Sequence, residues 1–305
     1  MMPIAALRTP DTRFAELPGW PWAPHYVENL AGYDGLRMHT VDEGPKDAAH
    51  TFLCLHGEPT WGYLYRRMIP VFLASGAPSG ARVVMPDLFG FGRSDKPIED
   101  GVYTWDFHRN SLVRFVERLD LRNITLVVQD WGGLLGLTLP VTFPDRIARL
   151  IVMNTAFGVG ETPSPGFVAW RDYVAKTPDL MCGGLIRRGT PHLTEAEAAA
   201  YDAPFPDRTY KAGVRRFPAL VPITPDMDGV AASKAARDWW SSQFTGKSFM
   251  AIGMKDPVLG QPVMTALRAH IRGCPPPLEI ADGGHFVQEW GTQIAHAALA
   301  QFGGV

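Results

Sequence analysis

The chain has 305 residues, of which 46% are hydrophobic and 20% are charged, and its formal net charge is −2. This composition is that of an ordinary globular protein and excludes a disordered chain, and the length allows one large domain or two modest ones. The near balance of scattered positive and negative charges offers no basic surface for nucleic acid or an anionic membrane, so we expect a small-molecule partner.

Three features predict a cytoplasmic protein. The first 14 residues hold only a short apolar run, broken by Arg8 and Pro10, so we expect no signal peptide. No window approaches the roughly 18 apolar residues of a membrane span. The cysteines are odd in number and widely spaced, which argues against a disulfide framework or a metal site: Cys54, Cys182 and Cys274.

Apolar, β-branched runs alternate with helical patterns along the chain, which predicts an α/β fold with a mostly parallel sheet covered by helices on both faces. Residues 25–30 and 36–44 flank a Gly-Tyr-Asp-Gly turn and predict an opening antiparallel hairpin at the sheet edge. The later runs predict strands at 51–57, 81–90, 124–130, 148–154, 247–256 and 277–284.

A helical insertion is expected within this alternation. The apolar face of residues 104–120 predicts a helix that covers the sheet. After the strand at 148–154 the strand pattern stops until about Pro225, and Thr194 begins a predicted helix over 193–201. We therefore expect a helical cap at 156–228 between two parts of the core, 1–155 and 229–305. It should lie over the carboxyl ends of the strands, where ligands bind in such sheets.

Residues 124–136, ITLVVQDWGGLLG, have the strand, sharp turn and helix context of a nucleophile elbow. The stretch departs from the pattern G-x-S-x-G because Val128 replaces the first glycine and Asp130 replaces the serine. Two glycines after Trp131 open a predicted helix over 134–143. A lone aspartate at such a turn is as readily a helix cap as a nucleophile, so other residues must decide.

Two further polar residues end predicted strands of the same sheet. Asp256 ends the strand at 247–256, and His285 follows the last strand. Taken alone, Asp256 fits a turn before Pro257, and a single histidine is more often structural than catalytic. The order Asp130, Asp256, His285 is the nucleophile, acid and base order of α/β-hydrolases, which favours a catalytic triad.

A turn after the strand at 51–57 supplies a fourth part of the expected site. The Gly57 break brings the backbone N–H of Glu58 towards that of Trp131, and the pair would form an oxyanion hole. A simple strand-to-helix turn explains Gly57 and Pro59 equally well. Only the place of this turn beside the elbow favours the catalytic interpretation.

A carboxylate at the elbow predicts alkyl transfer rather than acyl transfer. It is already ionised at neutral pH, and it is a weak nucleophile suited to displacing a good leaving group from a saturated carbon. The resulting ester of Asp130 would be hydrolysed by water, with His285 as general base and Asp256 stabilising the imidazolium.

The residues leave two leaving groups open at this point. An epoxide oxygen needs an acid such as a tyrosine hydroxyl. A halide needs N–H donors in an apolar site, and the indoles of Trp131 and Trp170 offer them. The alternative for both tryptophans is that they only fill the core.

At these residues the sequence resembles the haloalkane dehalogenases, specifically their first subfamily, which are α/β-hydrolases with a helical cap. The similarity runs from about residue 25 to the end, and five motifs carry it: VQDWGG around Asp130, HGEPTW around Glu58, GFVAW around Trp170, GMKDPVLG around Asp256 and GGHFVQEWG around His285.

The resemblance implies a role for each residue of the site. Asp130 is the nucleophile, His285 the base and Asp256 the triad acid. Trp131 and Trp170 bind the halide, and the substrates are a small haloalkane and water. No cofactor or metal is implied, and we expect a monomer. The positions that match the family's substrate pocket are Leu134, Phe167, Phe217, Pro218, Val221, Val258 and Leu259.

Related classes differ at identifiable positions. Epoxide hydrolases usually have a histidine before the nucleophile and an aromatic residue after the His-Gly pair, where this chain has Gln129 and Glu58. They also use paired cap tyrosines, and this chain has three tyrosines in the cap, so an epoxide hydrolase stays the alternative: Tyr173, Tyr201 and Tyr210. The second dehalogenase subfamily places a glutamate acid where this chain has Asn154, which favours Asp256 as the acid. A catalytically silent binding protein on the same scaffold is the third alternative.

Overall fold

The computed structural model describes residues 4–76 and 80–303, so the first three residues of the N-terminal stretch lie outside it. Its centre is an eight-stranded sheet in the order β10-β9-β8-β7-β4-β5-β3-β2. The pairs from β10 to β5 are parallel, and β3 and β2 add an antiparallel hairpin at one edge. The strands are β2 (His25–Glu28), β3 (Arg37–Glu43), β4 (Thr51–Leu55), β5 (Arg82–Pro86), β7 (Ile124–Gln129), β8 (Ile147–Met153), β9 (Lys247–Gly253) and β10 (Leu278–Ile280).

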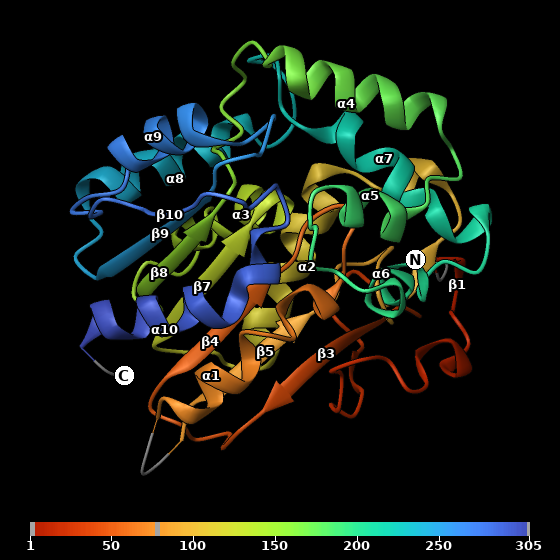
Figure 1. Ribbon diagram of the computed structural model, residues 1–305, viewed down its shortest axis with the longest axis horizontal. Helices are drawn as coiled ribbons and strands as arrows, with labels where there is room; N and C mark the ends of the chain where they lie inside the picture. The colour runs from red at the N-terminus through yellow and green to blue at the C-terminus, as the bar shows by residue number, and fades with distance from the viewer. Residues whose placement is uncertain (1–3, 77–79, 304–305) are drawn as a thin grey trace.

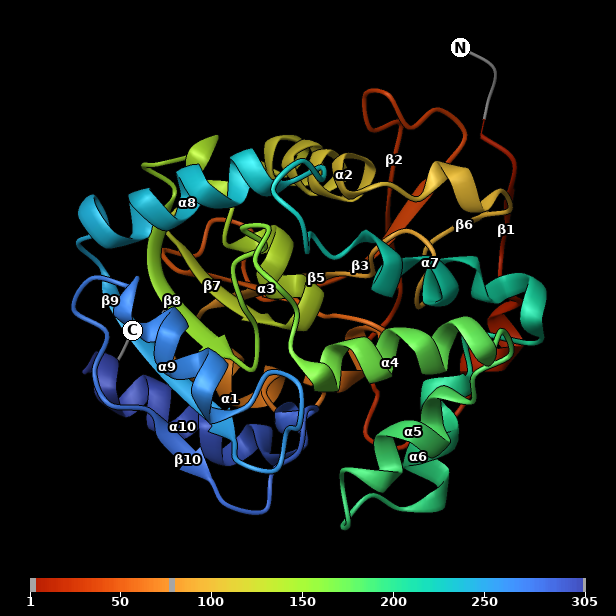
Figure 2. The ribbon, with the colours of Figure 1, turned by 90° about the horizontal axis from the view of Figure 1, so that it is seen from above.

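Helices cover both faces of this sheet. Figure 1 shows the sheet crossing the molecule, and Figure 2 shows α2 and α8 on one side of it with α1 and α10 on the other. Every residue of β4, β5 and β7 is buried, as expected of strands with helices on both faces. The core helices are α1 (Ile69–Ala74), α2 (Trp105–Arg118), α3 (Asp130–Gly136), α8 (Val230–Ser242), α9 (Gln261–Ala269) and α10 (Gly291–Phe302).

A helical insertion follows β8, so the predicted α/β architecture with a cap is confirmed. Figure 1 shows its green helices beyond one end of the strands. They are α4 (Pro165–Lys176), α5 (Cys182–Arg188), α6 (Glu195–Asp202) and α7 (Ala212–Leu220). Thr194 caps α6 as predicted, in a reciprocal capping box with Glu197. The limits 156–228 for the cap stay a prediction.

Short elements complete the fold. The 3₁₀ helices are η1 (Asp11–Phe14), η2 (Gly62–Tyr65), η3 (Asp100–Val102), η4 (Leu139–Val141), η5 (Arg208–Lys211) and η6 (Val287–Trp290), and β1 (Ala6–Leu7) pairs with β6 (Lys96–Pro97). Within residues 4–76 and 80–303, no helix has the length and apolar character needed to cross a membrane. The three cysteines are free and buried.

The helix predicted over 134–143 was wrong in its bounds. α3 begins at Asp130 itself and ends at Gly136, and a separate 3₁₀ turn, η4, follows at Leu139. Pro140 explains the break, because proline lacks an N–H and its ring would clash with the carbonyl four residues earlier, at Gly136. The elbow is therefore followed by a helix of only two turns.

Candidate active site

Asp130 lies at a sharp turn between β7 and α3. Its φ is +49°, in the left-handed region that residues other than glycine rarely adopt. The Asp130 N–H donates to the carbonyl of Asn154 at 3.0 Å, and the Thr155 hydroxyl donates to the Asp130 carbonyl at 2.7 Å. Gln129, not Asp130, is the N-cap residue of α3, and its side chain makes no capping bond. The carboxylate of Asp130 is directed towards the loop after β4.

That loop needs a glycine beside the carboxylate. A Cβ atom on Gly57 would lie 2.2 Å from Oδ1 of Asp130, closer than any side-chain contact allows. The next residue, Glu58, donates its backbone N–H to the same Oδ1 at 2.8 Å. Trp131 is the second residue of α3, where a backbone N–H has no acceptor within the helix. Of the two N–H groups predicted to form an oxyanion hole, that of Glu58 contacts the Asp130 side chain, and that of Trp131 belongs to the next residue along the chain.

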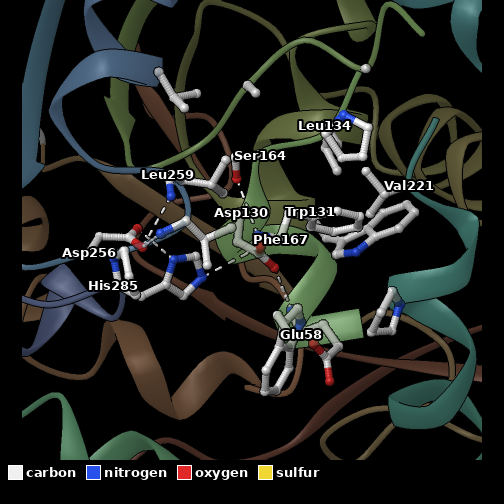
Figure 3. A pocket seen from close by; sticks show the side chains of 18 of the residues that line it. Glu58, Asp130, Trp131, Leu134, Ser164, Phe167, Val221, Asp256, Leu259 and His285 are labelled. Carbon is white, nitrogen blue, oxygen red and sulfur yellow. Dashed lines mark hydrogen bonds and ion pairs between the residues drawn. The ribbon is translucent and has the colours of Figure 1, made fainter. Parts of the chain in front are cut away.

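His285 and Asp256 complete a chain of contacts with Asp130. Nε2 of His285 lies 3.5 Å from Oδ2 of Asp130, and Nδ1 lies 2.7 Å from Oδ2 of Asp256. Figure 3 shows the imidazole between the two carboxylates. The three residues are separated by up to 155 positions in the sequence, and the carboxyl ends of three strands bring them together.

Asp256 is held as a buried anion. Its Oδ1 accepts the backbone N–H groups of Val258 at 2.8 Å and Leu259 at 3.1 Å. Asp256 therefore stabilises the turn at Pro257, as its simpler interpretation predicted, and also contacts His285. Asn154 donates to Oδ2 at 2.9 Å. Burial acts to raise the pKa of Asp256, but the contact with His285 and the N–H groups of Val258 and Leu259 lower it to about 2. The carboxylate is therefore ionised at neutral pH.

The two aspartates raise the pKa of the His285 imidazole. Burial lowers the pKa of His285, but the charges of Asp256 and Asp130 outweigh it and raise the pKa well above its ordinary value. For Glu58, burial and the charge of Asp130 raise the pKa well above its ordinary value, while the neighbouring Trp170 indole acts to lower it. The Glu58 side chain is buried, so the site holds one carboxyl group that favours its neutral form.

The carboxylate of Asp130 faces a cavity of about 360 Å³ between the strand ends and the insertion. All but one of the predicted pocket residues line it: Leu134, Phe167, Pro218, Val221, Val258 and Leu259, together with Trp131 and Trp170. Sequence reasoning missed other apolar lining residues. Phe286 lies in the motif around His285, where only its neighbour was singled out, and the segments of the others carry no recognisable motif: Phe157, Val159, Leu185, Ile223 and Val263.

Phe217 is the predicted pocket residue that does not line the cavity. It is fully buried behind the cavity wall, with its ring centroid 4.5 Å from that of Trp131 and 4.7 Å from that of Phe91. Successive residues of a helix point about 100° apart, so Pro218 faces the cavity while Phe217 faces the core. Phe217 supports the Trp131 indole from behind.

The halide and epoxide interpretations place different demands on this cavity. Trp131 and Trp170 both line it, and Figure 3 shows Asp130 between His285 and Trp131. No acceptor among the described residues pairs with the indole N–H of Trp131. No tyrosine is among the described residues that line the cavity. Tyr201, one of the cap tyrosines, is fully buried and donates to Glu289.

The fold and the site define the class of protein: an α/β-hydrolase with an aspartate at its elbow. The protein family described as alpha/beta hydrolase fold matches residues 50–292, more than half of the chain. The chain is 44% identical to a haloalkane dehalogenase of Psychrobacter cryohalolentis over 97% of both chains. It is 48% identical to haloalkane dehalogenase 1 of Mycobacterium tuberculosis, over 96% of this chain and 97% of that protein.

A solved structure gives the same result. The tetrameric haloalkane dehalogenase DpaA of Paraglaciecola agarilytica is 53% identical, with a TM-score of 0.94 over 97% of this chain and 98% of that one. This chain therefore belongs to the haloalkane dehalogenase family of the α/β-hydrolase superfamily.

Proposed function

We propose that this protein hydrolyses the carbon–halogen bond of small haloalkanes and releases an alcohol, a halide ion and a proton. The observation that carries the proposal is the Asp130 carboxylate, which faces an apolar cavity with His285 Nε2 3.5 Å away. The names of the full-length relatives support the same reaction. An uncharged substrate fits the largely apolar lining better than a charged haloacid does.

The first step is a displacement at carbon. A carboxylate oxygen of Asp130 forms a bond to the carbon that bears the halogen, and the carbon–halogen bond breaks with both electrons leaving on the halide. The indole N–H groups of Trp131 and Trp170 are the proposed donors to the departing ion. They are neutral, so they stabilise the anion without adding a fixed positive charge to the cavity.

The second step hydrolyses the alkyl ester. Nε2 of His285 takes a proton from water, and the water oxygen attacks the carboxyl carbon of Asp130. The bond from that carbon to the alkyl oxygen then breaks, the alkyl oxygen takes the proton from His285 and leaves as the alcohol, and the re-formed Asp130 carboxyl group releases the other water proton. The backbone N–H groups of Glu58 and Trp131 stabilise the tetrahedral oxyanion, and Asp256 stabilises the imidazolium. The charge of Asp130 is one of those that raise the pKa of His285, and alkylation removes it. The pKa of His285 therefore falls before hydrolysis, and more of the imidazole is in the neutral form that can take a proton from water.

Bromide release tests the reaction. We expect the purified protein to release bromide and the matching alcohol from short bromoalkanes, and Asp130→Ala to lose at least about 1,000-fold in rate, as is usual when a nucleophile is removed. A wild-type protein that forms diols from epoxides and releases no bromide would instead support the epoxide hydrolase alternative. An unreduced rate in Asp130→Ala would contradict the covalent mechanism.

We also propose the first dehalogenase subfamily for this chain. Glu58 follows His56 and Gly57, and Asp256, which contacts His285, follows β9, while the position after β8 is Asn154. These residues support the assignment, since the second subfamily has asparagine at the position of Glu58 and glutamate at the position of Asn154. We also propose that the protein is cytoplasmic and that it is a monomer.

A further inference from the structure

Gln129 contacts the imidazole that the proposed mechanism uses as its base. It is the last residue of β7, immediately before Asp130, and it is fully buried. Its Nε2 lies 2.9 Å from Nε2 of His285 and 3.1 Å from the carbonyl oxygen of the same residue. The base therefore has a third polar neighbour besides Asp130 and Asp256.

The contacts fix which end of the Gln129 amide faces His285. A carbonyl oxygen only accepts hydrogen bonds, so the group beside the His285 carbonyl is the NH₂ of Gln129. At the other end of the amide, the fully buried Gln288 donates its own Nε2 to Oε1 of Gln129 at 3.3 Å. The contact with the His285 carbonyl requires this orientation, and the contact with Gln288 agrees with it.

This orientation determines the tautomer of His285. A donor from Gln129 at Nε2 requires that Nε2 accept, so the single ring proton of the neutral imidazole lies on Nδ1, facing Asp256. An imidazolium would instead place a second N–H against the NH₂ group. Gln129 thus favours the unprotonated Nε2, which is the form that can take a proton from water.

The charged groups around the imidazole favour its protonated form, whereas Gln129 favours the unprotonated Nε2. Asp256 and Asp130 approach its two nitrogens, and both raise the His285 pKa, while Glu58 from the loop after β4 is a third nearby carboxyl. Two carboxylates thus favour the imidazolium, and the amide donor opposes them without bringing a charge. Its effect is greatest once alkylation has neutralised Asp130.

We propose that Gln129, oriented by Gln288, is a positioning residue for the hydrolytic step: its NH₂ group holds the imidazole ring in place with Nε2 free of a proton. The inference rests on the proposed function. During hydrolysis the water proton moves to Nε2, and Gln129 keeps its bond to the His285 carbonyl. The proton then leaves with the alcohol, which restores the contact.

Two variants separate the half-reactions. Gln129→Met keeps the length of the side chain without the donor, and Gln129→Glu replaces the donor with a carboxylate. Rapid mixing with a bromoalkane measures alkylation as the bromide burst and hydrolysis as the later formation of alcohol. For Gln129→Met we expect alkylation within about 3-fold of the wild type and hydrolysis slower by about 10-fold or more at neutral pH, the scale at which a displaced catalytic group affects rate.

The pH profile distinguishes this role from a merely structural one. Losing a donor to the unprotonated nitrogen raises the His285 pKa, so the acid limb of the hydrolysis profile should move to higher pH and the rate should recover partly in alkali. Gln129→Glu should move the acid limb further, because a carboxylate stabilises the imidazolium. Equal losses in both half-reactions with an unmoved profile, or an unchanged hydrolysis rate, would overturn the proposal.

A matched control and a separate readout complete the experiment. Gln301 on α10 donates to the Ser248 carbonyl away from the site, so Gln301→Met should leave both half-reactions and the profile unchanged. Nitrogen-15 NMR of labelled histidines, with the His285 signals assigned by their loss in His285→Phe, tests the tautomer in the resting protein without any substrate. A resting imidazole with its proton on Nε2 at alkaline pH would contradict the proposal even if the protein released no bromide.

Discussion

At the scale of single residues, Asp130 holds a strained conformation that the surrounding contacts maintain. A left-handed backbone costs a residue other than glycine about 1–3 kcal/mol, and the hydrogen bonds to Asn154 and Thr155 offset that cost. The turn raises the side chain out of the sheet, where its carboxylate meets the Glu58 N–H and the imidazole.

Replacing the base should separate the two chemical steps. In His285→Phe, alkylation of Asp130 needs no proton transfer and should proceed, while hydrolysis loses its general base. Intact-mass spectrometry after exposure to a reactive bromoalkane should show one alkyl group added, and peptide mapping should place it on Asp130. Adduct-free protein after prolonged exposure would contradict the role assigned to the imidazole.

A methyl group at Gly57 should displace the nucleophile. Because the new Cβ would lie 2.2 Å from Oδ1 of Asp130, Gly57→Ala must move the carboxylate, and a misplaced nucleophile typically costs about 100-fold in rate. The measurement is bromide release together with a melting curve. Gly101→Ala is the matched control, since a Cβ there meets nothing within 4 Å. Equal activity of the two variants would contradict the argument.

At the scale of elements, a partly buried ionic network joins cap helix α6 to the core. Glu197 on α6 accepts from Arg66 at 3.0 Å and from Arg67 at 2.6 Å. Arg66 also pairs with Glu289 of η6 at 2.7 Å, and Tyr201 of α6 donates to Glu289. η6 begins two residues after His285, so the network holds the cap close to the catalytic imidazole.

Removing the Glu197 charge should destabilise the protein in a pH-dependent manner. Burial acts to raise the pKa of Glu197, but the Thr194 donors and Arg66 lower it to about 2. A lowered pKa contributes stability that is complete above the ordinary value near pH 4.5 and is lost as pH falls towards 2. For Glu197→Gln we expect a melting temperature lower by about 2–4 °C at pH 7, with a gap that narrows in acid.

The control for this prediction lies on the same helix. Glu195 is exposed and pairs with Arg187, and an exposed ion pair contributes little, so Glu195→Gln should melt within about 1 °C of the wild type. Glutamine at position 197 still permits the capping box through its one oxygen, while its NH₂ group cannot accept from Arg66 or Arg67, so the variant keeps the cap and removes the ionic contacts. A Glu197→Gln gap that stays constant from pH 7 to acid would show that the charge is not responsible.

At the scale of the whole molecule, the site forms where the two parts of the core meet. β8 ends before the insertion and β9 begins after it, yet the two strands pair in parallel, with Met153 beside Ala251. That pairing sets Asp256 and His285, from the later part of the chain, against Asp130 from the earlier part. The insertion lies over the same edge, and its residues Phe167, Trp170 and Pro218 line the cavity.

The surface of the described chain supports the proposed monomer. Its exposed large hydrophobic side chains are few and come from different segments of the chain, as is normal for a monomer: Ile98, Val141, Tyr173 and Met181. Light scattering coupled to size-exclusion chromatography should give the mass of one chain. A mass of four chains would contradict the prediction and would match the tetramer of the related structure.

The sequence by itself determined the elements and most of the residues that meet at the site. Strand and helix periodicity, the glycines of the elbow and the cap residue Thr194 are local signals, since each depends on neighbours within a few positions. A parallel sheet gathers the carboxyl ends of its strands at one edge, so Asp130, Asp256 and His285 were expected to lie together, as they do.

Only the tertiary structure decided which way particular side chains face. Phe217 matched a pocket position but lies behind Trp131, because the rotation of α7 turns the neighbouring Pro218 towards the cavity. The contact between Gln129 and His285 joins residues 156 positions apart, and no local pattern encodes it. Such contacts depend on strand register and on packing between distant segments, which fix distances that spacing along the chain does not.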